Sequence, residues 1–148
     1  MKRVTAESVK LFPMNYWLVK QEPEKYSFDD LIRDGATDWT GVRNFQARNN
    51  LREMRVGDPV LFYHSVSEKA VVGAAVISRE AFQDSTDETG KWIAVEIKSL
   101  SKFENPITLD KIKREKKLEN IALIKQSRLS VLPLMREEFE TIVSLSRK

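Results

Sequence analysis

The sequence predicts an α+β protein that consists of a small, strongly curved β-sheet or barrel with short helices at its periphery. Four or five segments show the alternating or continuous apolar patterns of β-strands, and turns or short helical stretches separate them. These separations disfavour a doubly wound sheet, because that fold alternates strands with full helices. The chain has 148 residues and 41% of them are hydrophobic, which suits one domain with a real core.

The first strand and the first helix are expected near the start of the domain. Residues 15–23, NYWLVKQEP, are rich in aromatic and β-branched side chains, and Pro23 ends this strand. A short helix begins after Ser27, which stands at capping-box spacing from Asp30. Gly35 ends the helix. Its expected buried residues are Phe28, Leu31 and Ile32.

A loop and a second helix come next. Residues 38–44, DWTGVRN, are polar and are expected to form the loop. The helix is expected from about Phe45 to Met54, followed by a turn at 56–59, VGDP. The residues of this helix that we expect in the core are Ala47, Leu51 and Met54.

Three further strands are expected at residues 59–65, 69–82 and 88–103. In the last of these, apolar and other residues alternate in the pattern of a half-buried strand. The apolar set is Ile93, Val95 and Ile97, and the alternating set is Ala94, Glu96 and Lys98.

The C-terminal part combines helices with one extended segment. Thr108 is placed to cap a basic helix, and residues 126–133, QSRLSVLP, are expected to be extended. A final helix follows, with its buried residues at helical spacing. These residues are Phe139, Ile142 and Val143.

Residues 1–13 are expected to form a peripheral N-terminal extension, and residues 14–148 a single domain. The chain has no apolar run near the length that spans a membrane, and its first residues lack the apolar region of a secretory signal. Cysteine is absent, which rules out disulfides and thiol catalysis and suits a reducing compartment. We therefore expect no membrane association and a cytoplasmic location, or a nuclear one in a eukaryote.

His64, in the stretch LFYHS, is the single histidine of the chain and the first candidate for a catalyst or a metal ligand. On a strand its neighbour Ser65 points to the opposite face, so the two cannot readily share a proton. A zinc site needs several His or Cys ligands, and the five glycines are too scattered for a phosphate loop. We expect no catalytic residue, metal or cofactor. His64 is either a hydrogen-bonded residue at a strand end or part of a pocket wall.

The remaining chemistry suits the binding of a planar, charged ligand. Residues able to stack on it are Trp17, Trp39, Phe62 and Tyr63. Residues able to hydrogen-bond its edge are Asn44, Ser65 and Ser130. Residues able to meet an anion are Lys20, Arg43 and Arg128. Trp39 lies in a polar loop, where it can either stack on a ligand or cover the core.

Two segments of the chain are basic although the net charge is only +3. Residues 43–55 carry four arginines against one glutamate, and residues 111–128 carry seven basic groups. Each segment by itself can be an ordinary solvated helix face. Together, with asparagine and glutamine between the charges, they favour a polyanionic partner.

Four stretches resemble the EVE domain family, a branch of the PUA-like superfamily that is related to YTH domains. They are NYWLVKQEPEKYSFDDL, WTGVRNFQARNNLREMRVGDPVLFYHS, VVGAAVISREAF and SRLSVLPL. They occur in the family's order and cover nearly everything from Asn15 onward. The whole-chain resemblance is to bacterial stand-alone EVE proteins and to the thymocyte nuclear protein group.

The resemblance implies a small PUA-like, mixed or antiparallel β-barrel with flanking short helices and a pocket for a modified nucleobase. YTH relatives hold N6-methyladenosine in an aromatic cage, and EVE domains are associated with modified cytosine in DNA. The family pattern places the base pocket at Trp17, Lys20, Trp39, Val42, Asn44, His64, Ser65, Ser127, Leu129 and Ser130. With the basic segments, it favours backbone contacts from Arg43, Arg48, Arg52, Lys113 and Arg128.

The chain departs from the family pattern at two positions. The usual K-S/T-E-P reads KQEP here, so Gln21 replaces a hydroxyl residue. The final helix lacks a Ser or Thr cap, because Met135 follows VLPL. Such a change costs up to about 2 kcal/mol of stability.

These expectations favour a non-enzymatic module that binds nucleic acid carrying a modified base, DNA rather than RNA. The base would be flipped out of its stack and then held without reaction. The alternative is a sensor of a small molecule or nucleotide metabolite in the same pocket. A nucleic-acid-modifying enzyme is the third reading.

Overall fold

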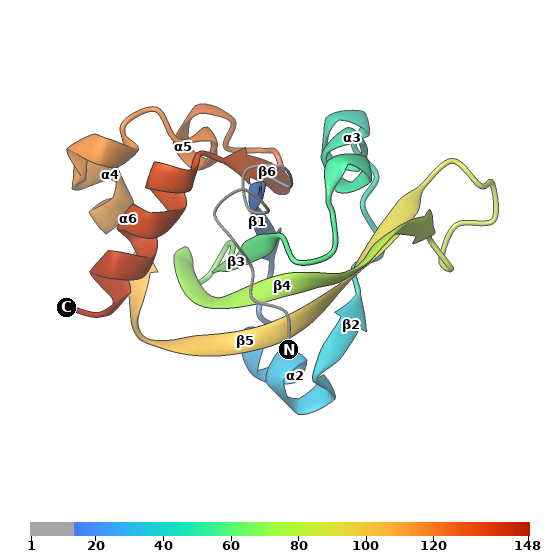
Figure 1. The fold of residues 1–148 in the computed structure, drawn as a ribbon, viewed down its shortest axis with the longest axis horizontal. Helices are drawn as coiled ribbons and strands as arrows, with labels where there is room; N and C mark the ends of the chain where they lie inside the picture. Colours follow the sequence, from blue (N-terminus) through green and yellow to red (C-terminus); the bar gives the residue numbers. More distant parts are fainter. Residues whose placement is uncertain (1–13) are drawn as a thin grey trace, which may run out of the picture.

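The computed structural model describes residues 14–148, and the expected extension at 1–13 lies outside the described residues. Strands and short helices follow one another along the chain (Figure 1). The strands are β1 (Tyr16–Gln21), β2 (Ala36–Asp38), β3 (Pro59–His64), β4 (Ala70–Gln83), β5 (Ile93–Thr108) and β6 (Val131–Leu134). The helices are α2 (Phe28–Asp34), α3 (Phe45–Glu53), α4 (Leu109–Arg114), the 3-10 helix η1 (Lys116–Leu118), α5 (Ala122–Lys125) and α6 (Arg136–Ser146). Within this part of the chain, no helix has the length and apolar character needed to span a membrane.

The six strands form one mixed sheet in the order β2-β5-β4-β3-β1-β6. β1 and β3 are parallel, and the other pairs are antiparallel. The long strands β4 and β5 bend across the molecule, and the register between them shifts at several points (Figure 1). The predicted α+β class and curved sheet are confirmed. Among the described residues the edge strands β2 and β6 do not pair with each other, so the barrel is not closed.

β1 and β3 form the parallel pair of the sheet. Parallel strands require a crossover connection, and here it contains α2, β2 and α3. The ends of β1 and β3 therefore lie side by side, with Gln21 opposite His64. The Ser65 N–H donates to the Gln21 carbonyl oxygen over 2.9 Å. Gln21 also lines a pocket together with Trp39 and Thr40, so the loop that precedes α3 lies beside the end of β1.

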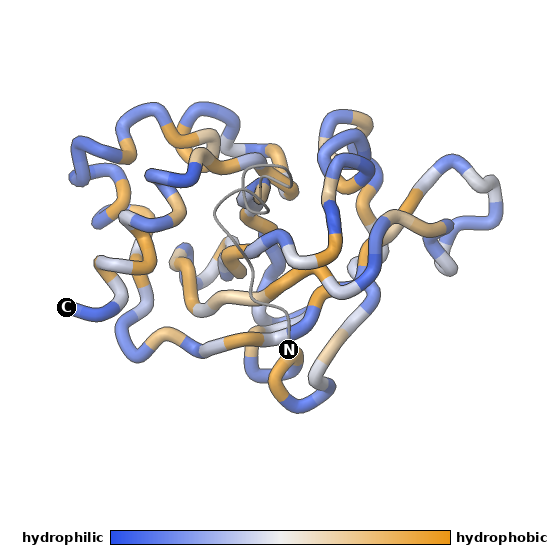
Figure 2. The backbone as a smooth tube through the Cα atoms, in the orientation of Figure 1, coloured by the Kyte–Doolittle hydropathy of each residue, from blue (hydrophilic) through white to orange (hydrophobic). Residues whose placement is uncertain are grey.

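The core lies between the central strands and the helices. Figure 2 shows apolar residues along these strands and a polar tip on the β4–β5 hairpin. Leu18, Leu61 and Phe62 are fully buried. Phe28 of α2 packs directly over Gly73 of β4, where a Cβ atom would come within 2.5 Å of the Phe28 ring. Glycine is therefore required at 73 for the close approach of α2 to the sheet.

Sequence signals place the ends of α2 and α3 correctly. Ser27 and Asp30 form the predicted capping box, and Gly35 ends α2 with a φ of 78°. α3 buries the expected Ala47, Leu51 and Met54. Ile32 was expected in the core but is 46% exposed, because α2 has only seven residues and Phe28 and Leu31 fill its contact with the sheet.

The C-terminal half differs more from the prediction. Residues 126–130 form a turn and a loop, and extended backbone begins only at Val131. The basic segment contains three short helical pieces, because buried apolar residues recur through it and tie it to the core. They are Ile112, Leu118, Ile121 and Leu123. Thr108 caps α4 as predicted, and at Met135 the Glu138 carboxylate accepts the backbone N–H over 2.8 Å.

Candidate nucleic-acid interface

The start of α3 and the loop at 126–130 lie side by side, and the loop contacts Lys20 near the end of β1. The Lys20 backbone N–H donates to the Ser130 carbonyl oxygen over 2.9 Å. Its Nζ donates to the Ser127 carbonyl oxygen, also over 2.9 Å. These two bonds fix the 126–130 loop beside β1, where the predicted pocket residues of the two segments meet.

A pocket of about 340 Å³, called here the α3 pocket, opens between the start of α3 and this loop. Its lining residues are Asn44, Gln46, Gln126, Ser127, Arg128 and Leu129. Leu129 is buried and gives the pocket an apolar element. The Gln46 amide nitrogen donates to the Gln126 side-chain oxygen over 2.8 Å and joins the two walls. The structure therefore brings four of the predicted pocket or backbone residues together: Asn44, Ser127, Arg128 and Leu129.

Asn44 and Lys20 have reduced freedom within this site. Asn44 is the N-cap of α3, and its side-chain oxygen accepts from the Ala47 N–H over 2.9 Å. Capping uses the carbonyl oxygen, so the amide group is the part that can donate to a ligand. Burial lowers the pKa of the Lys20 ammonium, which also lies 5.8 Å from the centre of the Tyr63 ring. Lys20 therefore acts first as a structural donor to the loop.

Trp39 is buried in the loop before α3, which matches the second of its two expected positions, a cover over the core. It is 5% exposed and packs edge-on against Phe62, with ring centroids 5.4 Å apart. One side of it lines a pocket of about 150 Å³, called here the Trp39 pocket. The other lining residues are Gln21, Tyr26, Thr37, Asp38 and Thr40. Trp39 thus belongs to the core and reaches a binding surface only at this pocket.

His64 lies apart from these two pockets and lines a third one, of about 250 Å³, together with residues of α2 and β5. It is buried, its Nε2 accepts from the Phe28 N–H over 3.0 Å, and its Nδ1 lies 3.2 Å from the Glu68 carboxylate. Because Nε2 accepts, Nδ1 carries the proton and donates to Glu68. His64 therefore satisfies one of the free N–H groups at the start of α2. Among the described residues no group of three or more His, Cys, Asp or Glu side chains is arranged to bind a metal ion.

Ser65, Trp17 and Val42 are also separated from the α3 pocket. Ser65 follows β3, and its N–H bonds to the end of β1. The Trp17 indole donates to the Asp58 carboxylate over 2.9 Å, near the opposite end of β1. Val42 is 7% exposed and belongs to the core. These side chains support the loops, and nothing in their geometry directs them to the α3 pocket.

The predicted backbone-binding cations are not equivalent. Arg43 pairs with Asp84 at 3.0 Å and donates to Thr86 at 3.0 Å. Burial acts to raise the pKa of Asp84, but hydrogen bonds from Thr86, Gly41 and Arg43 together keep it below its usual range. Arg128 lies at the α3 pocket, and Lys113 belongs to α4, on the opposite side of the molecule from α3 (Figure 1).

Arg48 and Arg52 lie on α3. The Arg48 guanidinium lies 4.9 Å from the Phe45 ring centre and 5.5 Å from that of Trp92. It also donates to the Lys91 carbonyl oxygen over 3.1 Å. Arg52 is exposed.

Several residues of the interface escaped the sequence interpretation. Gln46 and Gln126 line the α3 pocket, yet an exposed amide has no distinctive pattern in a single sequence. Phe45 and Trp92 form a stacked pair with ring centroids 5.1 Å apart. An available signal for Phe45 was an aromatic residue at the first position of a helix, outside the apolar stripe of Ala47 and Leu51.

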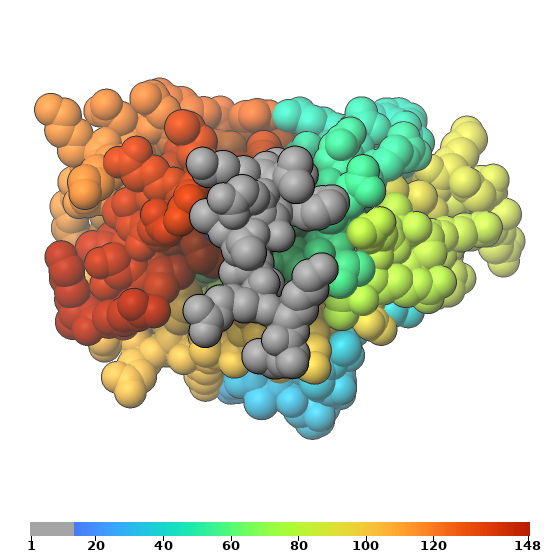
Figure 3. Space-filling view, in the orientation of Figure 1, coloured from blue at the N-terminus to red at the C-terminus, as the bar shows by residue number. Residues whose placement is uncertain are grey.

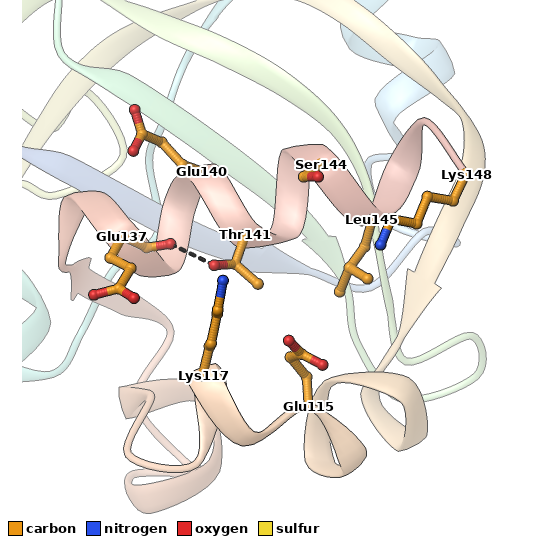
Figure 4. A pocket seen from close by; sticks show the side chains of 8 residues that line it. All are labelled: Glu115, Lys117, Glu137, Glu140, Thr141, Ser144, Leu145 and Lys148. Atoms are coloured by element: carbon orange, nitrogen blue, oxygen red, sulfur yellow. Dashed lines mark hydrogen bonds between the residues drawn. The ribbon is translucent and has the colours of Figure 1, made fainter.

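A further pocket lies between α6 and the segment that contains η1 (Figure 4). Its lining residues are Glu115, Lys117, Glu137, Glu140, Thr141, Ser144, Leu145 and Lys148. Three carboxylates against two lysines give this surface no attraction for a polyanion. The α3 pocket, which Arg128 adjoins, is the better candidate for nucleic acid.

Comparisons with known proteins identify a family and several relatives of the same fold. A family model described as the EVE domain matches residues 15–145. Thymocyte nuclear protein 1 of Homo sapiens is 33% identical, over 90% of this chain and 75% of that protein. The crystal structure of human THYN1 in complex with DNA containing 5-methylcytosine has a TM-score of 0.86 at 33% identity, covering 90% of this chain and 98% of that chain. A protein of Rhodopseudomonas palustris has a TM-score of 0.86 at 42% identity, covering 90% and 94%.

Proposed function

This chain belongs to the EVE domain family, and from that membership we propose that it binds DNA carrying a modified cytosine without reacting with it. The observation that carries the proposal is the human relative whose crystal structure contains 5-methylcytosine DNA, with a backbone that superposes at a TM-score of 0.86. The α3 pocket supports it with groups that suit a nucleobase. They are an amide, a hydroxyl, backbone atoms, an arginine and an apolar side chain.

A base inside a duplex cannot reach such a pocket, so it is flipped out of the stack before it is held. We assign the reading of its polar edge to the Asn44 amide and to the Ser127 and Ser130 segment. Arg128 at the same pocket is placed to meet the adjacent phosphate. No residue is assigned to bond making or breaking.

A panel of duplexes tests the proposal. Otherwise identical duplexes with a central cytosine, 5-methylcytosine or 5-hydroxymethylcytosine are titrated with the protein at fixed salt, together with the matching RNA. We expect tighter binding of one modified duplex than of the unmodified one. Equal affinity for all of them contradicts the proposal, as does product formation on prolonged incubation.

One observation favours a second candidate, a sensor of a free nucleoside or nucleotide. The α3 pocket, at about 340 Å³, falls within the volume range of small-ligand sites, roughly 300–1,000 Å³. A free 5-methylcytidine nucleotide that binds as tightly as the oligonucleotide identifies the sensor. A DNA-binding module loses most of its affinity when the flanking phosphates are removed.

A further inference from the structure

A cluster of aromatic and cationic side chains lies beside the α3 pocket and is not used by the function proposed above. Phe45 is at the start of α3, and Trp92 comes from the β4–β5 hairpin. Their rings are stacked at 29° with centroids 5.1 Å apart. The guanidinium of Arg48 lies over both rings, and that of Arg43 lies 5.7 Å from the centre of Trp92. We call these four residues the Phe45 platform.

The platform is open to solvent. Phe45 is 61% exposed, which is unusual for a phenylalanine that contacts other aromatic residues. Figures 1 and 3 show that the hairpin projects from the body of the molecule beside α3, so the platform lies on a prominent part of the surface. The sequence places Phe45 between Asn44 and Gln46, which both line the α3 pocket. The platform therefore adjoins that pocket across the first turn of α3.

The platform is also built with fixed geometry. Asp84 accepts from the Gly41 N–H, from Arg43 and from Thr86, which ties the hairpin to the loop before α3. Asp87 accepts from the Trp92 N–H over 2.9 Å. Arg48 is held over the rings at a cost, because its Nε is buried and has no hydrogen-bond partner among the residues that the structure describes. These bonds fix Trp92 and the arginines, and they leave the Phe45 ring as the exposed surface.

We propose that the Phe45 platform stacks on a base of the DNA strand next to the base held in the α3 pocket. Flat aromatic side chains flanked by arginines are the usual means of binding unstacked bases, because every base has a π-face and the guanidinium groups add cation–π attraction. Two acidic side chains of the hairpin, Asp84 and Asp87, are engaged by internal donors. This inference rests on the proposed function, since it needs a strand whose neighbouring base is already in the pocket.

Abasic nucleotides test the proposal directly. Duplexes with a central 5-methylcytosine are prepared with an abasic residue at each flanking position in turn, and Kd is measured for the unaltered protein and for Phe45→Leu. With all bases present, Phe45→Leu is expected to weaken binding by about 5- to 150-fold, the range found when one stacked base is lost. At the flanking position that contacts the platform, the abasic duplex should already be weak, and Phe45→Leu should then change Kd little.

Matched variants separate stacking from folding and from the proposed function itself. Phe45→Tyr keeps the ring and is expected to keep the affinity. Leu100→Ala changes a residue of the same 61% exposure on β5 and should leave Kd unchanged. Two results overturn the stacking proposal. In the first, Phe45→Leu binds every duplex like the unaltered protein. In the second, Phe45→Leu weakens binding of all abasic duplexes by the same factor. If the unaltered protein does not prefer 5-methylcytosine at all, the proposed function fails instead.

Discussion

Val66 shows how a single residue carries strain in a turn of the sheet. It follows Ser65 in the β3–β4 turn, has a φ of 69° and is 63% exposed. A β-branched side chain at positive φ costs about 1–2 kcal/mol, whereas glycine adopts this region freely but loses about 0.5–1 kcal/mol of chain entropy. Val66→Gly is therefore expected to raise the free energy of unfolding by roughly 0.5–1 kcal/mol. Chemical denaturation measures it.

Val56 provides the matched control for this change. It is 61% exposed in the turn after α3, and its φ is not positive. Val56→Gly gains no relief of strain and should lower the free energy of unfolding by about 0.5–1 kcal/mol. Two changes of the same kind should therefore have opposite signs. A loss of stability in both variants means that the turn does not strain Val66.

His64 yields a second prediction at this scale. Its Nε2 is the acceptor for the buried Phe28 N–H, so His64→Phe leaves that donor unpaired and should cost about 1–3 kcal/mol of stability. His64→Gln restores an acceptor oxygen and should recover much of the loss. Thermal unfolding measures both, and DNA binding by the folded fraction is expected to persist. Equal melting temperatures for the two variants contradict a capping role.

Side-chain roles were the least predictable part of the site. Trp39 and His64 have strong chemical identities, and the sequence placed them in a polar loop and at a strand end. Their roles depend on contacts that are distant in sequence, Phe62 for Trp39 and Phe28 for His64. A single sequence does not contain these contacts, so it left each residue between a ligand-binding role and a structural one, and the contacts now described are with the core for Trp39 and with a helix terminus for His64.

At the scale of elements, the β4–β5 hairpin should keep its structure until the pH is strongly acidic. The pKa of Asp87 is lowered to about 2, first by the Thr89 hydroxyl and also by the N–H groups of Thr89 and Trp92. A carboxylate whose pKa is lower in the folded protein than in the unfolded chain stabilises the fold above the unfolded value, and that contribution disappears as the pH falls through the folded value. We therefore expect the hairpin tip to stay ordered down to about pH 4 and to loosen as the pH approaches 2, judged by amide exchange of Trp92.

Asp87→Asn provides the control for this titration. The variant has no carboxylate to protonate, so the protection factor of its Trp92 amide, which is the intrinsic exchange rate divided by the observed one, should be lower at neutral pH and should not change with pH in the acidic range. If the tip of the unaltered protein loosens well above pH 4, another group controls it.

The elements that the sequence predicted well are those with their own local signals. α2 and α3 have N-caps and apolar stripes within a few residues, and both were placed to within one or two positions. Thr108 marks the start of α4, but residues 111–128 after it contain no such signals. Their short pieces exist because buried side chains such as Leu118 and Ile121 attach them to the core, and short helices have little stability of their own.

At the scale of the whole molecule, the strand order decides which residues come together in a pocket. The sequence predicted the class of the fold but not the parallel pairing of β1 with β3, because strand order depends on contacts across the entire chain. The antiparallel pairing of β1 with β6 in the same sheet places Lys20 beside the 126–130 loop, and Asn50 of α3 donates to the Val131 carbonyl oxygen next to that loop. The α3 pocket is therefore a product of topology, although its residues Asn44 and Arg128 could be selected from the sequence.

Electrostatics of the whole molecule provides the last prediction. A net charge of +3 gives weak overall attraction, so the salt dependence of DNA binding must come from particular cations. Each phosphate that a free cation neutralises contributes a slope of about −0.9 to the plot of log K against log salt concentration on duplex DNA. Arg128, exposed at the α3 pocket, should contribute one such contact, so Arg128→Ala should make the slope shallower by about 0.9. Arg43 is already paired with Asp84, so Arg43→Ala should leave the slope nearly unchanged and lower stability instead. The reverse result, with the slope changed by Arg43→Ala alone, would place the phosphate backbone along the hairpin and away from the α3 pocket.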